Sequence, residues 1–163
     1  MFLPYLAGER TPHLDPRARA AFIGLTLAHG RGHLTRAVLE GATLALRDSL
    51  EIFHELKVPV KQIRATGGGA KNPFWRQMQA DVFGQSVTAM AADEGPAYGV
   101  ALLAAVGAGH YKNITEACTA TVRTAESSDS DAKTHKTYDR MFSRYQALYQ
   151  ALREDFAAAG SYI

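Results

Sequence analysis

Three consecutive glycines between a short apolar segment and a helix start constrain this chain more than any other feature. The segment Val60–Thr66 is typical of a buried strand, and Gly67–Gly69 follow it directly. Glycine has no Cβ, so the backbone can turn at positive φ and a ligand can approach the main chain. Asn72 and Pro73 suit the N-cap and first position of the next helix, whose free N–H groups favour an anionic or hydrogen-bonding ligand. The pattern predicts either a nucleotide-binding turn or a tight strand-to-helix turn that binds nothing.

Two other glycine motifs do not fit this segment. A dinucleotide-binding fingerprint needs Gly-x-Gly-x-x-Gly, but Asn72 stands at the position of the third glycine after Gly67 and Gly69. A P-loop needs Gly-x-x-x-x-Gly-Lys-Ser/Thr, and that string occurs nowhere in the chain. The choice between a ligand site and a plain turn therefore depends on the rest of the sequence.

Composition excludes several classes of protein. With 163 residues, 47% hydrophobic and 21% charged, the chain suits one globular domain. The net charge of +2 comes from scattered basic residues, which argues against a nucleic-acid or anionic-membrane partner. Cys118 is the only cysteine, so we expect no intrachain disulfide and a reducing, cytoplasmic setting. No apolar run approaches the ~20 residues that a membrane span needs.

Hydrophobic periodicity divides most of the chain into helices and strands. It predicts an amphipathic helix over Leu34–Leu56, which Pro59 ends. After the glycines we expect a helix from Pro73 that Gly84 terminates, a strand over Val87–Met90, and a small-residue helix over Ala97–Gly109. Two successive strand–helix units imply a parallel strand pair in an α/β fold, with ligands at the carboxyl ends of the strands.

The two ends of the chain are less regular. Phe2–Leu6 is strand-like but has no turn or cap before it, so we expect an incomplete N-terminal edge. We expect residues 1–118 to form the core and the polar stretch 119–136 to be an exposed connection. An aromatic stripe predicts a closing helix over 137–159, which packs on the domain body or, alternatively, forms a dimer contact.

Four ordered blocks of sequence resemble the carboxy-terminal domain of the FGGY-type carbohydrate kinases, and within that family most closely the enzymes that act on D-xylulose. The blocks are Phe2–Pro12, Phe22–His29 with His33–Gly41, Thr66–Asn72 with Trp75–Asp81, and Glu94–Gly99. Gly24–Glu40 resembles the second family signature, and the glycine block resembles the adenosine motif of the actin- and hexokinase-like ATPases. The stretch beyond about Thr119 adds nothing to the resemblance.

The resemblance implies a fold and a ligand. In that family two ribonuclease H-like domains, of the actin-like ATPase kind, enclose the active site, and the adenosine end of ATP lies on the carboxy-terminal domain. Carried over residue by residue, the nucleotide contacts would be Gly67, Gly68, Gly69 and Asn72, with Ala70 lining the adenine seat. ATP and Mg²⁺ are then the implied cofactors. Asn72 has an alternative role, because its side chain can also serve only as a helix cap.

The resemblance also implies that part of a kinase lies outside this sequence. The family places its sugar site, first phosphate loop and catalytic aspartate in an amino-terminal domain that has no counterpart in these residues. Phosphoryl transfer needs a base near the nucleophile and charge neutralisation, so we expect the isolated chain to be inactive. The expected partners are an adenine nucleotide, the missing amino-terminal domain and, through the uncovered cleft face, a second copy of the chain.

No side chain in the sequence is assigned a catalytic or metal-binding role. The carboxylates near motifs are better explained as surface pairs, helix first-turn residues or solvated groups: Glu9, Glu40, Asp81, Asp93 and Glu94. His29 and His33 are four residues apart, but glycines separate them and no third ligand has a supporting spacing. We expect them to make polar loop contacts instead.

Two functions from different classes follow. The first is the ATP-binding half of a pentulose kinase that transfers the γ-phosphate of MgATP to a ketopentose, with D-xylulose as the leading substrate. The second is a non-catalytic domain of the actin-like ATPase fold that binds a nucleotide or a partner chain. Nothing in these residues selects a sugar, so the substrate rests on the resemblance.

Overall fold

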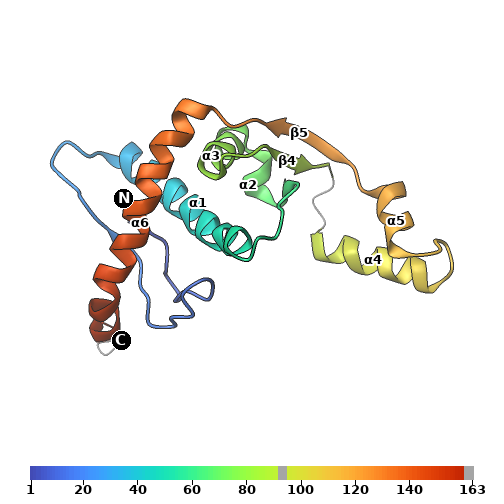
Figure 1. Cartoon of the computed structure of the whole chain (residues 1–163), viewed down its shortest axis with the longest axis horizontal. Helices are drawn as coiled ribbons and strands as arrows, with labels where there is room; N and C mark the ends of the chain where they lie inside the picture. The colour runs from blue at the N-terminus through green and yellow to red at the C-terminus, as the bar shows by residue number, and fades with distance from the viewer. Residues whose placement is uncertain (92–94, 160–163) are drawn as a thin grey trace. The chain divides into compact units, whose positions relative to one another are not determined.

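The computed structural model describes residues 1–91 and 95–159, which form two compact units. The first unit holds Met1–Lys61, Asp81–Gly84 and the segment from Asp131 onward. The second holds Gln62–Ala80 and Gln85–Ser130. Figure 1 shows the elements of both units along the chain. In the part of the chain described, no helix is both long and apolar enough to cross a membrane.

The first unit is built on two long helices. The helix α1 (Arg31–Glu55) packs against the strand β1 (Phe2–Leu3), which pairs antiparallel with β2 (Ala21–Phe22). The helix α6 (Ala132–Ala159) also contacts α1 (Figure 1). Its aromatic stripe is buried, which confirms that the predicted closing helix packs on the body of the protein: Tyr138, Phe142, Tyr145, Tyr149 and Phe156.

Hydrogen bonds between buried side chains fix the N-terminal segment on α6. The Tyr145 hydroxyl donates to the Tyr5 hydroxyl at 2.8 Å, and the Tyr149 hydroxyl donates to Asp15 Oδ2 at 3.1 Å. Burial raises the pKa of Tyr5 and Tyr145. Buried polar groups are stable only when they are hydrogen-bonded, so this network holds the long loop after β1 in one position.

The second unit contains the three-stranded sheet. β3 (Ile63–Ala65) pairs parallel with β4 (Val87–Met90), and β4 pairs antiparallel with β5 (Thr124–Ser128). Ile63 lies opposite Val87 and Ala65 opposite Ala89, so the two parallel strands end at the same edge. The remaining helices are α2 (Gly68–Lys71), α3 (Pro73–Phe83, which contributes to both units), α4 (Gly95–Gly107) and α5 (Ile114–Thr121).

The parallel pair and the helices after Pro73 confirm the predicted strand–helix alternation, and Gly84 ends α3 at φ +69°. Residues 119–136 are mostly exposed, as predicted, but the prediction that they form only a connection is wrong, because α5 extends to Thr121 and two further elements lie in this stretch. β5 occupies 124–128, and α6 begins at Ala132 rather than at 137. The polar composition of 124–128 did not indicate a strand, because β5 is an edge strand of the sheet and Ser128 is its only buried residue.

Candidate nucleotide-binding site

The three glycines do different things in the structure. Gly67 has φ +80° and ψ −178°, a combination that is essentially restricted to glycine, and it takes the chain from β3 into α2. Gly68 and Gly69 lie within the single turn of α2. Only Gly67 therefore uses the positive φ that the sequence pattern suggested for the run.

The main chain is open at two of these positions and closed at the third. A Cβ placed on Gly67 or Gly68 would meet no atom within 4 Å, so both residues face free space. A Cβ on Gly69 would lie 2.6 Å from the Trp75 ring, so packing alone explains that glycine. We call the open main chain at Gly67 and Gly68 the glycine ledge.

Asn72 caps the helix that follows the ledge, as the sequence predicts. Its Oδ1 accepts hydrogen bonds from the backbone N–H groups of Phe74 at 3.0 Å and Trp75 at 3.4 Å. The cap uses the side-chain oxygen, so a ligand would meet the amide NH₂ group of this exposed residue. Ligand contact by Asn72 thus stays compatible with capping and stays a prediction.

Arg76 anchors the backbone just after the glycine ledge, at Ala70, and the sequence did not reveal this contact. Its side chain is 5% exposed, and Nη1 donates to the Ala70 carbonyl at 3.0 Å. Nε donates to the Ser128 hydroxyl on β5 at 3.2 Å, and Nη2 pairs with Glu126 at 2.7 Å. Ala70 is itself 4% exposed, and its carbonyl is the group that Arg76 anchors.

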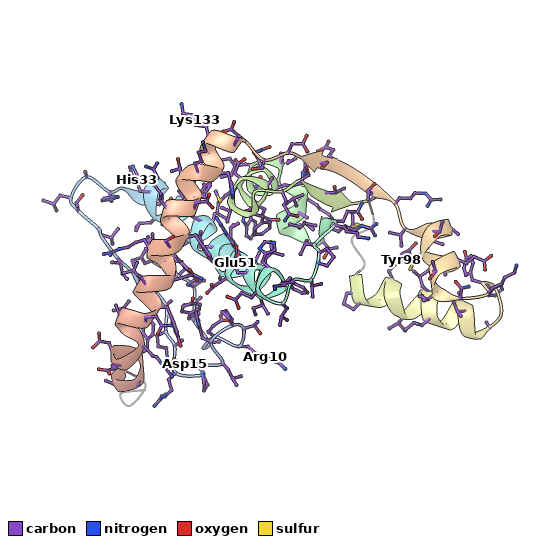
Figure 2. All side chains as sticks on the ribbon, viewed as in Figure 1. Arg10, Asp15, His33, Glu51, Tyr98 and Lys133 are labelled. Atoms are coloured by element: carbon purple, nitrogen blue, oxygen red, sulfur yellow. The ribbon has the colours of Figure 1, made fainter. Side chains whose placement is uncertain are left out.

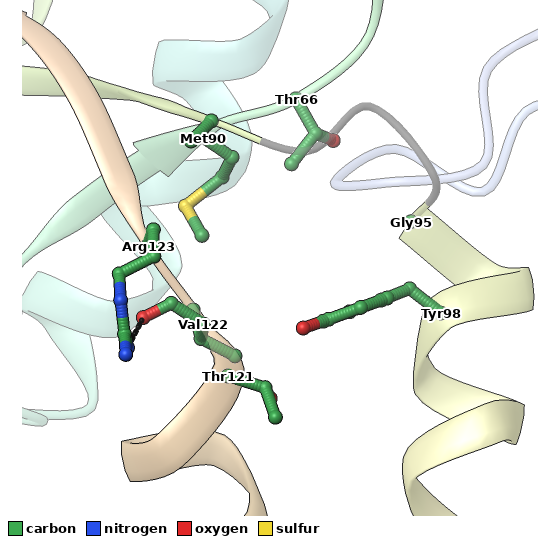
Figure 3. A pocket seen from close by; sticks show the side chains of 8 residues that line it. Thr66, Met90, Gly95, Tyr98, Thr121, Val122 and Arg123 are labelled. Atoms are coloured by element: carbon green, nitrogen blue, oxygen red, sulfur yellow. Dashed lines mark hydrogen bonds between the residues drawn. The ribbon is translucent and has the colours of Figure 1, made fainter.

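A cavity of about 360 Å³ lies at the carboxyl ends of β3 and β4 (Figure 3). One of its residues, Thr66, directly precedes Gly67. Ligands of α/β sheets bind outside the carboxyl ends of parallel strands, and this cavity has that location. The lining comes from the strand ends, α4 and the link from α5 to β5: Thr66, Met90, Ala91, Gly95, Tyr98, Thr121, Val122 and Arg123.

The carboxylates considered from the sequence have structural partners. Glu40 pairs with Arg36 at 2.7 Å, which confirms the predicted helical pair, and Glu9 accepts from the Thr11 backbone N–H. The expectation that Asp81 is solvated is wrong: the residue is 7% exposed, and its Oδ1 accepts from the Asp131 backbone N–H at 2.8 Å. Asp93 and Glu94 lie outside the described residues.

The two histidines at the start of α1 make the predicted polar loop contacts. His29 Nδ1 lies 2.9 Å from the Thr26 hydroxyl, and His33 Nδ1 accepts from the Gly30 backbone N–H at 3.2 Å. His33 is labelled at this helix start in Figure 2. Within residues 1–91 and 95–159, no three histidine, cysteine or acidic side chains form a group that could hold a metal ion.

Comparison with known families identifies the chain. Residues 1–108 match the family described as "FGGY family of carbohydrate kinases, C-terminal domain". The chain belongs to this family. The four blocks that suggested it from the sequence lie within the matched range, and the glycine ledge is part of it.

The FGGY relatives most similar to the chain include several xylulose kinases. The xylulose kinase of Bacillus subtilis is 40% identical over 149 residues, which cover 91% of this chain and 30% of that protein. That of Escherichia coli K12 is 40% identical over 152 residues, 93% of this chain and 31% of that protein. The chain therefore spans about a third of the length of the relatives it matches.

Solved structures agree with this assignment. A ligand-bound xylulose kinase from Lactobacillus acidophilus superimposes with a TM-score of 0.85 at 31% identity, covering 97% of this chain and 32% of that one. A gluconate kinase from the same organism gives 0.83 at 31% identity, with 100% and 32% coverage. The fold is that of an FGGY carboxy-terminal domain in the sugar kinase and actin-like ATPase group, as the sequence predicted.

Proposed function

We propose that this chain is the ATP-binding part of a pentulose kinase that transfers the γ-phosphate of ATP to a ketopentose, most specifically D-xylulose. The observation that carries the proposal is an open glycine ledge in an FGGY domain whose relatives include xylulose kinases at 40% identity. A gluconate kinase is among the similar structures, so the family alone does not fix the sugar.

In this proposal the chain binds and orients the nucleotide. The bare main chain at Gly67 and Gly68 lets the adenosine lie against the backbone, and the Asn72 amide hydrogen-bonds to it. In the reaction the sugar hydroxyl bonds to the γ-phosphorus, the bond to ADP breaks, and the hydroxyl proton passes to a base. The resemblance assigns that base to the other kinase domain, so we propose that these 163 residues bind nucleotide without turnover.

Mg²⁺ would accompany the phosphates of the nucleotide. Magnesium in kinases keeps several water ligands and is held largely by substrate phosphates, with one or two carboxylates. The described residues offer no acidic cluster for it, and we assign none of them to the metal. Their proposed task is confined to the nucleoside end of the ligand.

Nucleotide binding by the isolated chain is the first test. We expect ADP and MgATP to bind and to change the fluorescence of Trp75, the single tryptophan, whose ring packs beside Gly69. Gly68→Val fills the ledge without a clash and should weaken binding by about tenfold or more, as measured by calorimetry. Asn72→Ala should weaken binding too, together with a loss of about 1 kcal/mol from the helix cap.

The control for this test is Gly32→Ala, which adds a methyl group in open space on α1. It should leave nucleotide binding unchanged. Equal weak binding of ATP, GTP and inorganic triphosphate, insensitive to Gly68→Val, would show that charge alone attracts the ligand. That result would contradict a nucleotide site on the ledge.

A second experiment tests phosphoryl transfer and the sugar. A chimera in which residues 1–159 replace the matching third of the Bacillus subtilis xylulose kinase should phosphorylate D-xylulose from MgATP. Gly68→Val in the chimera should raise the KM for ATP more than that for the sugar, because the ledge is proposed to contact only the nucleotide. A chimera that binds ADP and phosphorylates no pentulose would contradict the kinase proposal and would favour a non-catalytic binding domain.

A further inference from the structure

The helix α6 packs on the body of the first unit through one face only. Its buried aromatic residues recur from Tyr138 to Phe156 at helical spacing, so they form a single stripe along this 28-residue helix. At about 100° per residue, the opposite face of the helix carries Arg140, Arg144, Ala147, Ala151 and Glu154. All five residues are exposed, and we call them the outer face of α6.

The charges on α6 are distributed in the opposite sense to the one that an isolated helix favours. Lys133 lies in the first turn (Figure 2), whereas Glu154 and Asp155 lie just before the last turn. The positive end of the helix dipole is at the N-terminus, so each of these charges lies near the end that repels it. The one acidic residue in the first half of α6, Asp139, is already paired with Arg47 of α1 at 2.6 Å.

The charged residues of the outer face have no partner within their own chain. Lys136, Arg140 and Arg144 follow one another at intervals of four residues, so neighbours on the helix surface carry like charges, which is unfavourable. Among residues 1–91 and 95–159, none of Arg140, Arg144 and Glu154 makes an ion pair or a side-chain hydrogen bond. The outer face therefore carries unpaired cations in its first half and an unpaired anion in its second half.

An antiparallel second copy of the helix complements this arrangement. In a twofold pair that places Ala147 opposite the partner's Ala151, Arg144 lies opposite the partner's Glu154, because both positions are three residues away from that contact. The twofold axis repeats every contact, so two Arg–Glu pairs form. The small alanine side chains at the centre let the two helix axes approach to about 8 Å. Antiparallel pairing also sets the two helix dipoles against each other favourably.

We propose that the outer face of α6 binds a second copy of this chain in an antiparallel homodimer. Ala147 and Ala151 lie at its centre, and Arg144 forms reciprocal ion pairs with the partner's Glu154. A single pair of helices buries less area than a standard protein interface, so the dimer is reversible, with an expected Kd of about 10 to 100 μM. Salt screens surface ion pairs, so the Kd rises with ionic strength. This inference does not depend on the proposed nucleotide function.

Exchange of the two charges tests the ion pairs. Sedimentation equilibrium of the 163-residue chain between about 10 μM and 1 mM should show a monomer–dimer equilibrium. Arg144→Glu and Glu154→Arg each place like charges opposite one another twice per dimer, so each should raise the Kd by about tenfold or more. The double variant with both substitutions restores opposite charges in every pair and should recover most of the dimerisation.

The matched control is Lys133→Glu, which makes the same change of charge on the same helix. Lys133 is exposed and lies about 16 Å along the axis from Arg144, outside the overlap of the two helices in the proposed register. This variant should change the Kd by no more than about twofold. All the variants should keep the helical circular dichroism of the unmodified chain, because every substituted side chain is exposed.

Disulfide cross-linking tests the direction and register of the helices. Cys118→Ser removes the single cysteine, and Ala147→Cys and Ala151→Cys are then made as separate variants. In the proposed register, position 147 lies opposite position 151 of the partner but is displaced by about 6 Å along the axis from position 147 of the partner. A disulfide needs close Cα atoms, so a mixture of the two variants should link on mild oxidation at least about tenfold faster than either variant alone.

Three results would overturn the proposal. A chain that stays monomeric at about 1 mM does not use this face for a second copy. A dimer that neither Arg144→Glu nor Glu154→Arg weakens forms through another surface. A single cysteine variant that links as fast as the mixture shows that the helices are parallel or paired in another register. Recovery of the dimer on charge exchange, together with fast linking in the mixture alone, is the result expected.

Discussion

Replacing Arg76 by methionine is expected to cost about 2 to 4 kcal/mol of unfolding free energy and to abolish measurable nucleotide binding. Methionine keeps the length of the buried stem but leaves the Ala70 carbonyl and the Ser128 hydroxyl without their donor. Each buried polar group that loses its partner costs about 1 to 3 kcal/mol. The ledge precedes Ala70 by two residues, so its position depends on this anchor. Urea unfolding followed by Trp75 fluorescence measures the first effect, and calorimetry with ADP measures the second.

A matched variant separates the anchor from the ion pair. Arg76 also pairs with Glu126 at 2.7 Å, but the Glu126 side chain is 79% exposed. Ion pairs with such an exposed partner contribute about 0 to 1 kcal/mol, so Glu126→Gln should leave both stability and ADP binding nearly unchanged. If Glu126→Gln costs as much as Arg76→Met, the ledge is stabilised by the ion pair and not by the hydrogen bond from Arg76 to the Ala70 carbonyl.

The parts of the site that the sequence predicted depend on the local preferences of a few neighbouring residues. Gly67 adopts a conformation that other residues avoid, and Asn72 and Pro73 occupy positions that their side chains favour at a helix start. The strands around them follow from apolar runs bounded by turn residues, and their parallel pairing follows from the intervening helix. Each of these features depends on a few neighbouring residues, so the sequence was sufficient to predict them.

The side chains that stabilise the site make contacts with residues far away in the sequence. Sequence analysis could not predict these contacts. Arg76 reaches Ser128, 52 residues away, and nothing in the residues around it marks an arginine as buried. Asp81 is a charged residue of a type usually found at the surface, yet its carboxylate accepts a hydrogen bond from the backbone N–H of Asp131. The polar strand β5 supplies the partners of Arg76 while burying only Ser128 of its own residues, so its pattern resembled a loop.

The cavity was even harder to predict from the sequence, because four separate segments line it. Its walls come from the ends of β3 and β4, from the first turn of α4 and from the segment after α5. In the sequence, Met90 belonged to a predicted strand and Tyr98 to a small-residue helix, but Val122 and Arg123 fell in the stretch expected to be an exposed connection. Because that stretch was predicted as a connection, the residues that form one wall of the cavity were not recognised. The sequence therefore located the glycine ledge but not the cavity beside it.

The largest loss of stability in the first unit is expected from Gly41→Ala. Gly41 lies on the face of α1 that packs against β1, and a Cβ there would overlap the carbonyl oxygen of Phe2. Main-chain atoms cannot rotate away as a side chain can, so α1 must move off β1 to admit a single methyl group. We expect a cost of about 3 kcal/mol or more, the range of severe overpacking, measured by urea unfolding followed by helical circular dichroism.

Gly32→Ala on the same helix makes the opposite prediction and serves as the matched control. No atom lies within 4 Å of a Cβ at Gly32, and alanine is the better helix former, so this variant should gain about 0.5 to 1 kcal/mol. The pair compares one added methyl group in two settings on one helix, which removes intrinsic propensity as an explanation. If Gly41→Ala unfolds at the same urea concentration as the unmodified chain, α1 is not held against β1 by direct backbone contact, and the packing described for this unit is incorrect.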